Sequence, residues 1–193
     1  AQERVARELA ADMAKDLPML RLVQGDVGSG KTLVAARAAL DTIDAGYQVA
    51  FMAPTELLAE QHHANLSAWF EPLEQPVAWL SGRTKGKARA GILEALASGR
   101  LPIVVGTHAL FQDDVEFKNL GLIVVDEQHR FGVHQRLSLA DKGSGGMHPH
   151  QLALTATPIP RSLAMVAYGD LDCSVIDELP PGRQPVTTTL IDH

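Results

Sequence analysis

The sequence has 193 residues, of which 46% are hydrophobic and 21% charged, as in an ordinary globular domain with a sizeable core. No apolar run approaches the roughly 20 residues that a membrane helix needs, so we expect no membrane partner. The single cysteine, Cys173, excludes an internal disulfide and favours a reducing cytoplasm, and we interpret it as a small core residue.

The net charge and the first residues bear on whether the protein binds nucleic acid and whether it carries a signal peptide. A formal net charge of −6 is unusual for a nucleic-acid-binding protein, in which a basic surface is expected. Either this region touches few phosphates and other domains supply the DNA affinity, or nucleic acid is not the partner. The start Ala-Gln-Glu-Arg lacks the basic and apolar regions of a signal peptide. It also lacks an initiator methionine, so we expect a piece of a longer protein.

Short apolar runs alternate with helix-like segments along most of the chain. Strands are predicted at Leu20–Gln24, Val49–Ala53, Val77–Leu80, Ile103–Val105, Leu120–Val125, Leu152–Leu154 and Cys173–Ile176. Helices are predicted at Glu3–Lys15, Lys31–Ala45, Glu56–Trp69, Lys85–Ser98 and Ser162–Tyr168. Several strands are rich in Val and Ile with little polar alternation, which is typical of a parallel sheet buried on both faces. The sequence therefore predicts an α/β fold with a doubly wound, mostly parallel sheet, in which ligands bind beyond the carboxyl ends of the strands.

Two stretches have the composition of loops or linkers. Residues 142–149 (Lys-Gly-Ser-Gly-Gly-Met-His-Pro) are typical of a surface loop. Residues 179–185 (Leu-Pro-Pro-Gly-Arg-Gln-Pro) are typical of a boundary between domains. The β-branched run Val186–Ile191 predicts the first strand of a further domain. We therefore place one domain at residues 1–178, and a linker with the start of a second domain at residues 179–193.

The most specific motif is a phosphate loop of the pattern G-x4-G-K-[ST], between the first predicted strand and the second predicted helix. Its glycines let backbone N–H groups surround an anion, and the helix after it presents the positive end of its dipole. The Lys31 ammonium can reach the β- and γ-phosphates of a nucleotide, and the Thr32 hydroxyl can bind Mg²⁺. A coincidental glycine-rich turn is the alternative. We expect the nucleotide to be held by Gly25, Asp26, Val27, Gly28, Ser29, Gly30, Lys31 and Thr32.

An acidic pair follows an apolar strand. Residues 122–125 (Leu-Ile-Val-Val) would carry Asp126 to the carboxyl edge of the sheet, where its carboxylate can hold the water shell of Mg²⁺. Glu127 is then placed to orient the attacking water and accept its proton. By itself this pair is a weak signal, because acidic residues often close strands in solvent. Together with the phosphate loop it predicts ATP hydrolysis, with Glu127 and Lys31 as catalytic residues.

Residues 126–129 (Asp-Glu-Gln-His) resemble the motor motif of the DExH helicases and translocases. The resemblance implies a RecA-like P-loop NTPase lobe in which His129 joins the catalytic set and links the nucleotide state to the rest of the motor. A solvent-exposed loop histidine is the alternative. Residues 154–158 (Leu-Thr-Ala-Thr-Pro) resemble the motif that couples hydrolysis to lobe movement, which assigns this role to Thr155, Ala156 and Thr157. The alternative there is a strand-ending turn closed by a hydroxyl.

Three further positions are assigned by the same resemblance. Residues 53–57 (Ala-Pro-Thr-Glu-Leu) resemble the first DNA-backbone motif, in which Thr55 would cap a helix and offer N–H groups to a phosphate. A plain helix cap is the alternative and is compatible with this role. Residues 106–108 resemble a further strand-contacting motif, which adds Thr107 as a DNA contact. Gln2 is placed like the glutamine that reads adenine in related motors, because an amide can pair with both the donor and the acceptor of that base.

Three longer stretches show which group of helicases the sequence resembles. Residues 21–32, 126–136 and 155–161 together resemble the RecG family of branch-migration helicases and the related transcription–repair coupling translocases, and Gln128 and residues 177–183 favour RecG. The resemblance implies an ATP- and Mg²⁺-dependent bacterial motor, expected to be monomeric, that remodels branched DNA such as stalled forks and Holliday junctions. It implies a wedge domain before Ala1, and a second motor lobe with an arginine finger after His193. We therefore expect this chain alone to be inactive as an ATPase.

Other function classes also use a phosphate loop. A GTPase needs an Asn-Lys-x-Asp motif to read guanine, and the sequence has none. A small-molecule kinase would not need the motifs at residues 126–129 and 155–157 in this order. A nucleotide-dependent interaction module without hydrolysis remains an alternative, because a single lobe can bind nucleotide without turning it over.

Overall fold

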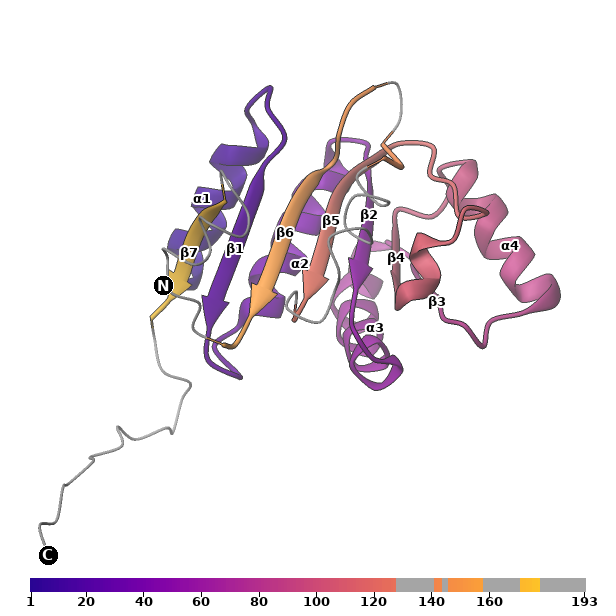
Figure 1. Cartoon of the computed structure of the whole chain (residues 1–193), viewed down its shortest axis with the longest axis horizontal. Coiled ribbons are helices and arrows are strands. Elements are labelled where there is room, and N and C mark those ends of the chain that lie inside the picture. The colour runs from indigo at the N-terminus through magenta and orange to yellow at the C-terminus, as the bar shows by residue number, and fades with distance from the viewer. Residues whose placement is uncertain (128–140, 144–145, 158–170, 178–193) are drawn as a thin grey trace, which may run out of the picture.

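The computed structural model describes residues 1–127, 141–143, 146–157 and 171–177, which form a parallel sheet with helices on both faces (Figure 1). The strands are β1 (Leu20–Gly25), β2 (Gln48–Met52), β3 (Val77–Leu80), β4 (Ile103–Gly106), β5 (Leu120–Asp126), β6 (His150–Thr155) and β7 (Asp172–Ile176). The helices are α1 (Gln2–Met13), α2 (Lys31–Asp44), α3 (Glu56–Phe70) and α4 (Gly86–Ala97), with short 3-10 helices η1 (Glu71–Leu73) and η2 (His108–Phe111).

The strand order brings the predicted motifs to one edge of the sheet. The order is β3-β4-β2-β5-β6-β1-β7, and all six strand pairings are parallel. Gln24 of β1 is the register partner of Thr155, and Leu154 of β6 is the register partner of Asp126. The carboxyl ends of β1, β6 and β5 are therefore level and adjacent. This arrangement confirms the predicted α/β fold with a doubly wound parallel sheet.

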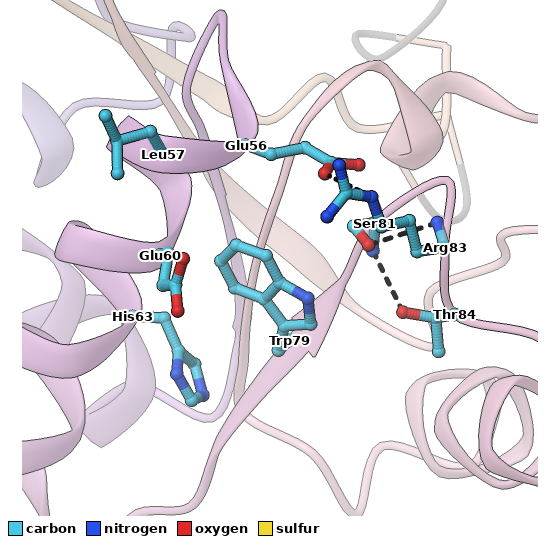
Figure 2. Close-up of a pocket in the computed structure, with 8 residues that line it drawn as sticks. All are labelled: Glu56, Leu57, Glu60, His63, Trp79, Ser81, Arg83 and Thr84. Carbon is cyan, nitrogen blue, oxygen red and sulfur yellow. Dashed lines mark hydrogen bonds and ion pairs between the residues drawn. The ribbon is translucent and has the colours of Figure 1, made fainter.

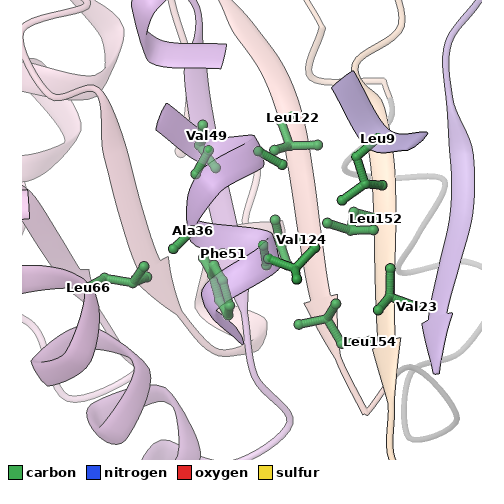
Figure 3. Packing of buried hydrophobic residues seen from close by; sticks show 14 of the residues in the cluster. Leu9, Val23, Ala36, Val49, Phe51, Leu66, Leu122, Val124, Leu152 and Leu154 are labelled. Atoms are coloured by element: carbon green, nitrogen blue, oxygen red, sulfur yellow. The ribbon is translucent and has the colours of Figure 1, made fainter. Parts of the chain in front are cut away.

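The sheet is buried on both faces, as the Val- and Ile-rich strands predict. In β2 all residues are buried: Val49 and Phe51 pack into the core beneath α1, α2 and α3, whereas Ala50 and Met52 pack into the core beneath α4 and η2. Figure 3 shows the first of these cores, in which Leu66 of α3 faces the strands. Because side chains alternate between the two faces of a strand, helices must cover both faces of this sheet.

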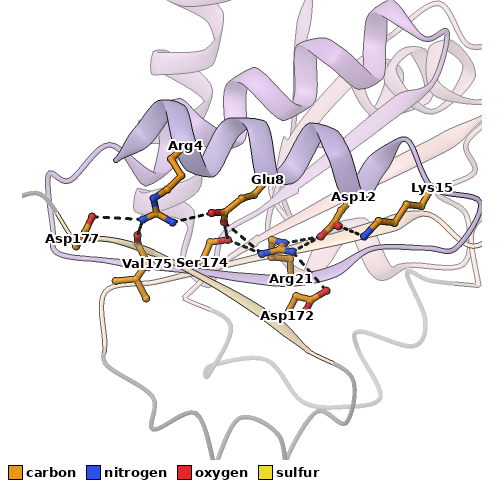
Figure 4. Close-up of polar contacts among 9 residues, drawn as sticks. All are labelled: Arg4, Glu8, Asp12, Lys15, Arg21, Asp172, Ser174, Val175 and Asp177. Atoms are coloured by element: carbon orange, nitrogen blue, oxygen red, sulfur yellow. Dashed lines mark hydrogen bonds and ion pairs between the residues drawn. The ribbon is translucent and has the colours of Figure 1, made fainter.

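Helix α1 is fixed to the sheet by a row of charged side chains (Figure 4). Arg21 of β1 lies at its centre, where Nε donates to Asp12 Oδ2 at 2.8 Å and Nη1 donates to Ser174 Oγ at 2.7 Å. Burial raises the pKa of Asp12, but hydrogen bonds from Lys15 and Arg21 outweigh this effect, so the pKa lies below its ordinary value. The row joins α1 to β1 and β7 and so holds the helix that begins at Gln2.

The observed elements differ from the predicted ones mainly at their ends. Strand β1 extends to Gly25 and β5 to Asp126, one residue further than predicted in each case, and α4 begins at Gly86 after the extended residue Lys85. The two 3-10 helices were not predicted. The predicted helix at Ser162–Tyr168 and the predicted linker at residues 179–185 lie outside the described residues.

Within the part of the chain that the structure describes, no helix combines the length and the apolar character that crossing a membrane requires.

Candidate nucleotide-binding site

The phosphate loop joins β1 to α2 in a conformation that depends on its glycines. Gly28 has a φ of 82° and Gly30 a φ of 90°, values in the left-handed region that favours glycine. A Cβ at Gly25 would lie 2.5 Å from Ser29 Oγ, so this position has no room for a side chain. Ser29 is buried, and its hydroxyl oxygen has no hydrogen-bond partner among the described residues. A narrow backbone turn with an unpaired buried hydroxyl fits an anionic ligand.

Lys31 is the first residue of α2, a helix with no side-chain cap, which leaves its N-terminal N–H groups for an anion or water. The Lys31 Nζ atom donates to the carbonyl oxygens of Gly25 at 2.6 Å and Asp26 at 2.8 Å. Burial lowers the pKa of Lys31, and the nearby carboxylates of Asp126, Glu127 and Asp26 oppose this shift. The ammonium group therefore lies within the electrostatic influence of the acidic pair on β5.

Gln2 contacts the phosphate loop from α1. Its Nε2 atom donates to the Ser29 carbonyl oxygen at 2.8 Å. A Cβ at Gly30 would lie 2.2 Å from this same nitrogen, so the amide packs tightly against the loop backbone. The structure thus brings Gln2 to the predicted site, and its role in reading adenine stays a prediction.

The acidic pair ends β5 in a tight turn. Asp126 closes the strand, and Glu127 has a φ of 51°, which is unusual for a residue with a side chain. The Glu127 N–H donates both to the carbonyl oxygen of Leu154 and to Oδ1 of Asp126, each at 2.9 Å. These bonds fix the turn against β6 despite its backbone strain. Strain of this kind concentrates at functional sites.

Thr155 ends β6 and is almost fully buried. Its Oγ1 accepts a hydrogen bond from the Thr157 N–H at 3.1 Å and donates to the Thr157 carbonyl oxygen at 3.4 Å. The hydroxyl-closed turn that we considered as the alternative is therefore present. The coupling role of Thr155, Ala156 and Thr157 is compatible with this turn and stays a prediction. His129 lies outside the described residues.

The two predicted DNA contacts have different surroundings. Thr55 is exposed and caps α3, where its side chain accepts from the Leu58 N–H at 3.3 Å, which confirms the predicted helix cap. Thr107 follows β4 and is 1% exposed, and its hydroxyl has no partner in the described part of the chain. A phosphate contact at Thr107 would therefore require a change in exposure. Both DNA contacts stay predictions.

A cavity of about 620 Å³ lies between the start of α3 and β3, beside the Thr55 cap (Figure 2). The Nε atom of Arg83 lies 2.9 Å from Oε2 of Glu56, so the positive charge of this arginine is balanced within the cavity. The rings of His63 and Trp79 meet edge to face, with centroids 5.6 Å apart. Glu60 adds a second carboxylate, so the lining has a slight excess of negative charge. The cavity therefore adds no basic surface near Thr55.

His62 of α3 also lies at this edge and was not predicted from the sequence. Its Nε2 atom lies 2.6 Å from Oδ2 of Asp126, although 64 residues separate the two in the chain. The buried face of α3 consists of Ala59, His62, Leu66 and Phe70, at the spacing of a helix face that packs on a core. A histidine within this apolar stripe was the available signal, because buried polar side chains require a partner.

Known proteins with similar sequences are helicases. A model of the DEAD/DEAH box helicase family matches residues 1–166. The ATP-dependent DNA helicase RecG of Escherichia coli is 66% identical over 192 residues, which cover 99% of this chain and 28% of that protein. The protein of the same name from Haemophilus influenzae is 62% identical over 194 residues, covering 100% of this chain and 28% of the relative. The chain thus spans 28% of the length of these relatives.

Solved structures show the same similarity. A structure of RecG bound to a three-way DNA junction superposes with a TM-score of 0.80 and 46% identity, covering 96% of this chain and 24% of the RecG chain. The helicase MrfA bound to DNA gives a TM-score of 0.69 at 20% identity, which shows a shared fold alone. Because the family model matches residues 1–166 of the 193, this chain belongs to the DEAD/DEAH box helicase family.

Proposed function

We propose that this chain is the first motor lobe of an ATP-dependent DNA helicase that remodels branched DNA, such as stalled forks and Holliday junctions. The observation that carries the proposal is the convergence of the phosphate loop and the acidic pair on one edge of the sheet, with the Thr155 turn between them. The high identity to RecG of Escherichia coli supports the choice of DNA substrate, as does the similarity to RecG bound to a three-way junction.

The nucleotide in this proposal is ATP with Mg²⁺. The N-terminus of α2 and the loop around Gly28 would hold the phosphates, and Gln2 would read the adenine. Among the described residues, no group of three or more His, Cys, Asp and Glu side chains could hold a metal ion by itself. This fits Mg²⁺, which keeps several waters and is usually bound by one or two protein groups together with substrate phosphates. Those groups would be Thr32 and Asp126.

Hydrolysis in this proposal depends on the side chains of Glu127, Lys31 and His129. Bound Mg²⁺ would neutralise charge on the phosphate oxygens and orient them for in-line attack. Glu127 would accept the proton of the attacking water, from a backbone that is fixed by two hydrogen bonds to its N–H. Lys31 would exchange its present carbonyl partners for the β- and γ-phosphate oxygens. His129 and the turn at Thr155 would transmit the nucleotide state to the rest of the motor.

We further propose that residues 1–178 are one domain and that residues 179–193 lead to a second motor lobe. In the full-length protein, a wedge domain would precede this lobe, and the whole would act as a monomer on DNA in the bacterial cytoplasm. The support is that the chain covers 28% of bacterial relatives that are named as DNA helicases. Because the cation that stabilises the transition state would come from the second lobe, the isolated chain would bind nucleotide without efficient turnover.

The nucleotide site is tested on this chain by isothermal titration calorimetry with Mg-ADP. We expect Lys31→Ala to abolish binding, because the variant loses the only positive charge of the phosphate loop. In the full-length protein, Glu127→Gln should retain ATP binding and lose turnover, because an amide cannot accept the proton of water. Unchanged nucleotide affinity in Lys31→Ala would place the nucleotide elsewhere, and normal turnover in Glu127→Gln would remove Glu127 from the mechanism.

The two-lobe proposal is tested by steady-state phosphate release from this chain and from the full-length protein, each with and without forked DNA. An arginine finger contributes about 10³–10⁵ in rate in GTPases, so we expect the isolated chain to be at least about a thousandfold slower. DNA should not stimulate it, because DNA would act by closing two lobes. Turnover by the isolated chain near the full-length rate would contradict the proposal and direct attention to Arg161 as an internal finger.

A further inference from the structure

The carboxylate of Asp126 is held by hydrogen bonds from two different elements. His62 Nε2 lies 2.6 Å from Oδ2, and the side chains of the two residues are only 8% and 13% exposed. The other oxygen, Oδ1, accepts the backbone N–H of Glu127 at 2.9 Å. Because each oxygen has its own donor, the plane of the carboxylate is fixed before any ligand binds.

The contact with Asp126 assigns the donor of this hydrogen bond. A carboxylate oxygen accepts hydrogen bonds, so Nε2 of His62 donates to Oδ2. Nδ1 is buried, and it has no partner among the residues that the structure describes. The rest of the buried face of α3 is apolar, and a leucine at this position would fill the space without leaving a polar atom unpaired. Packing therefore does not explain the histidine, whereas its bond to Asp126 does.

The position of the imidazole is set by α3 and β2 together. The ring packs against Phe51 of β2 with centroids 4.8 Å apart and an interplanar angle of 47°. The His62 side chain belongs to α3, a helix of 15 residues that begins directly after the Thr55 cap. Residues 55 and 62 are about two helical turns apart, so a shift of the capped end would move the imidazole as well.

We propose that His62 is a positioning residue for the metal-binding carboxylate, and that it ties the placement of α3 to the metal site. This inference rests on the proposed function, in which Asp126 holds the water shell of Mg²⁺. By donating to Oδ2, while the Glu127 N–H donates to Oδ1, His62 holds the carboxylate in one orientation. Hydrogen-bond partners that orient a metal ligand typically contribute about 10- to 100-fold to metal affinity.

The test measures metal affinity rather than turnover, using this chain with ADP. Mn²⁺ binding is followed by electron paramagnetic resonance, and ADP affinity is measured by calorimetry in Mg²⁺ and in EDTA. His62→Leu removes the donor, whereas His62→Gln places an amide nitrogen near the position of Nε2. His62→Asn carries the same amide on a side chain too short to reach. We expect His62→Leu and His62→Asn to weaken metal binding about 10- to 100-fold, His62→Gln to retain most of it, and all three to bind metal-free ADP normally.

His63→Leu is the matched control. His63 is the next residue of the same helix, and its Nε2 bonds to the Val77 carbonyl oxygen at 3.0 Å, away from Asp126. The His63→Leu variant should retain the metal affinity of the unmodified chain. An equal loss of metal affinity in this control would show general loosening of α3 and would overturn the inference.

Other outcomes are equally decisive. Unchanged Mn²⁺ affinity in a folded His62→Leu variant would overturn the inference and leave the proposed function intact. If His62→Leu does not fold, as judged by circular dichroism, the comparison of His62→Gln with His62→Asn decides, and equal metal affinity in those two overturns the inference. Failure of the unmodified chain to bind Mg-ADP would instead overturn the proposed nucleotide site itself, and this inference with it.

Discussion

Replacing Gly30 by alanine tests whether the phosphate loop depends on close contact between its backbone and Gln2. The residue has a φ of 90°, and a Cβ there would lie 2.2 Å from Gln2 Nε2 and 2.8 Å from Gln2 Cδ. The new methyl group would therefore strain the backbone and displace the glutamine side chain. The displaced side chain would also lose its hydrogen bond to the Ser29 carbonyl oxygen, which is 2.8 Å long.

The two effects have separate magnitudes. The left-handed conformation costs an L-residue about 1–2 kcal/mol, and the smaller entropy of an unfolded chain with alanine returns about 0.4–1 kcal/mol. Backbone strain alone should therefore lower the free energy of unfolding by about 1 kcal/mol. Loss of the Gln2 hydrogen bond adds about 1 kcal/mol. We expect Gly30→Ala to lose about 2 kcal/mol in total and to bind Mg-ADP at least about tenfold more weakly, which corresponds to 1.4 kcal/mol.

Gly46 provides the matched control for strain. Its φ is 87°, and a Cβ there would meet nothing within 4 Å. Gly46→Ala should therefore lose about 1 kcal/mol and keep its nucleotide affinity. Stability is measured by urea denaturation, and affinity by calorimetry. In the double variant Gln2→Ala with Gly30→Ala, the obstacle is absent, so the losses should be less than additive by about 1 kcal/mol.

The reasoning is refuted if Gly30→Ala and Gly46→Ala lose equal stability and both bind Mg-ADP as tightly as the unmodified chain. That result would mean that Gln2 moves aside freely and that its contact with the loop has no energetic importance.

Three further predictions concern charge. Arg21→Met leaves Asp12, which is 7% exposed, with fewer hydrogen-bond partners. The free energy of unfolding, measured by urea denaturation, should fall by about 2–3 kcal/mol, slightly less than for a fully buried ion pair. A loss under about 0.5 kcal/mol would contradict this expectation. Burial lowers the pKa of His150, so its contribution to stability is complete above the unfolded pKa of about 6.5 and is lost as pH falls toward the folded pKa. His150→Gln should flatten the stability curve in that window, and an identical curve would refute the assignment. Glu56→Gln removes the ion-pair partner of Arg83, and DNA binding by this variant is measured by fluorescence anisotropy at several salt concentrations. The slope of log affinity against log salt should become more negative by up to about 0.9 and stay shallower than about −4. An unchanged slope would show that Arg83 contacts no phosphate.

Local patterns predicted the fold, and they predicted which segments meet at the candidate nucleotide site. The apolar run before Asp126 is long enough to indicate a buried strand, and the phosphate loop requires a strand before it and a helix after it. Because parallel strands end at the same edge of a sheet, the two motifs could be placed together without knowing the strand order. The order itself, with β1 between β6 and β7, is set by packing between distant segments and was not predicted.

Contacts between distant elements account for what the sequence did not predict. The bond between His62 and Asp126 depends on where the packing of α3 against β3 and β4 places this helix, and no local periodicity contains that information. The burial of Thr107 has a similar cause. Gly106 ends β4 so close to strand β3 that a Cβ there would lie 2.3 Å from the Leu80 carbonyl oxygen, and Thr107, the next residue, is buried. A motif resemblance identifies a position in the chain but not whether its side chain faces solvent.

The position of β1 has a consequence for biosynthesis. Gly25, at the start of the phosphate loop, is the register partner of Ile176 in β7, which the ribosome adds about 150 residues later. At about 5–20 residues per second, roughly 8–30 s pass before the strand that precedes the loop can acquire this neighbour. Leu22 and Val23 remain without their final neighbours during that interval, when an apolar strand is prone to aggregation. In the proposed function, ATP would bind to a loop whose preceding strand is completed only at that point, so the ligand would add its stabilisation late in synthesis.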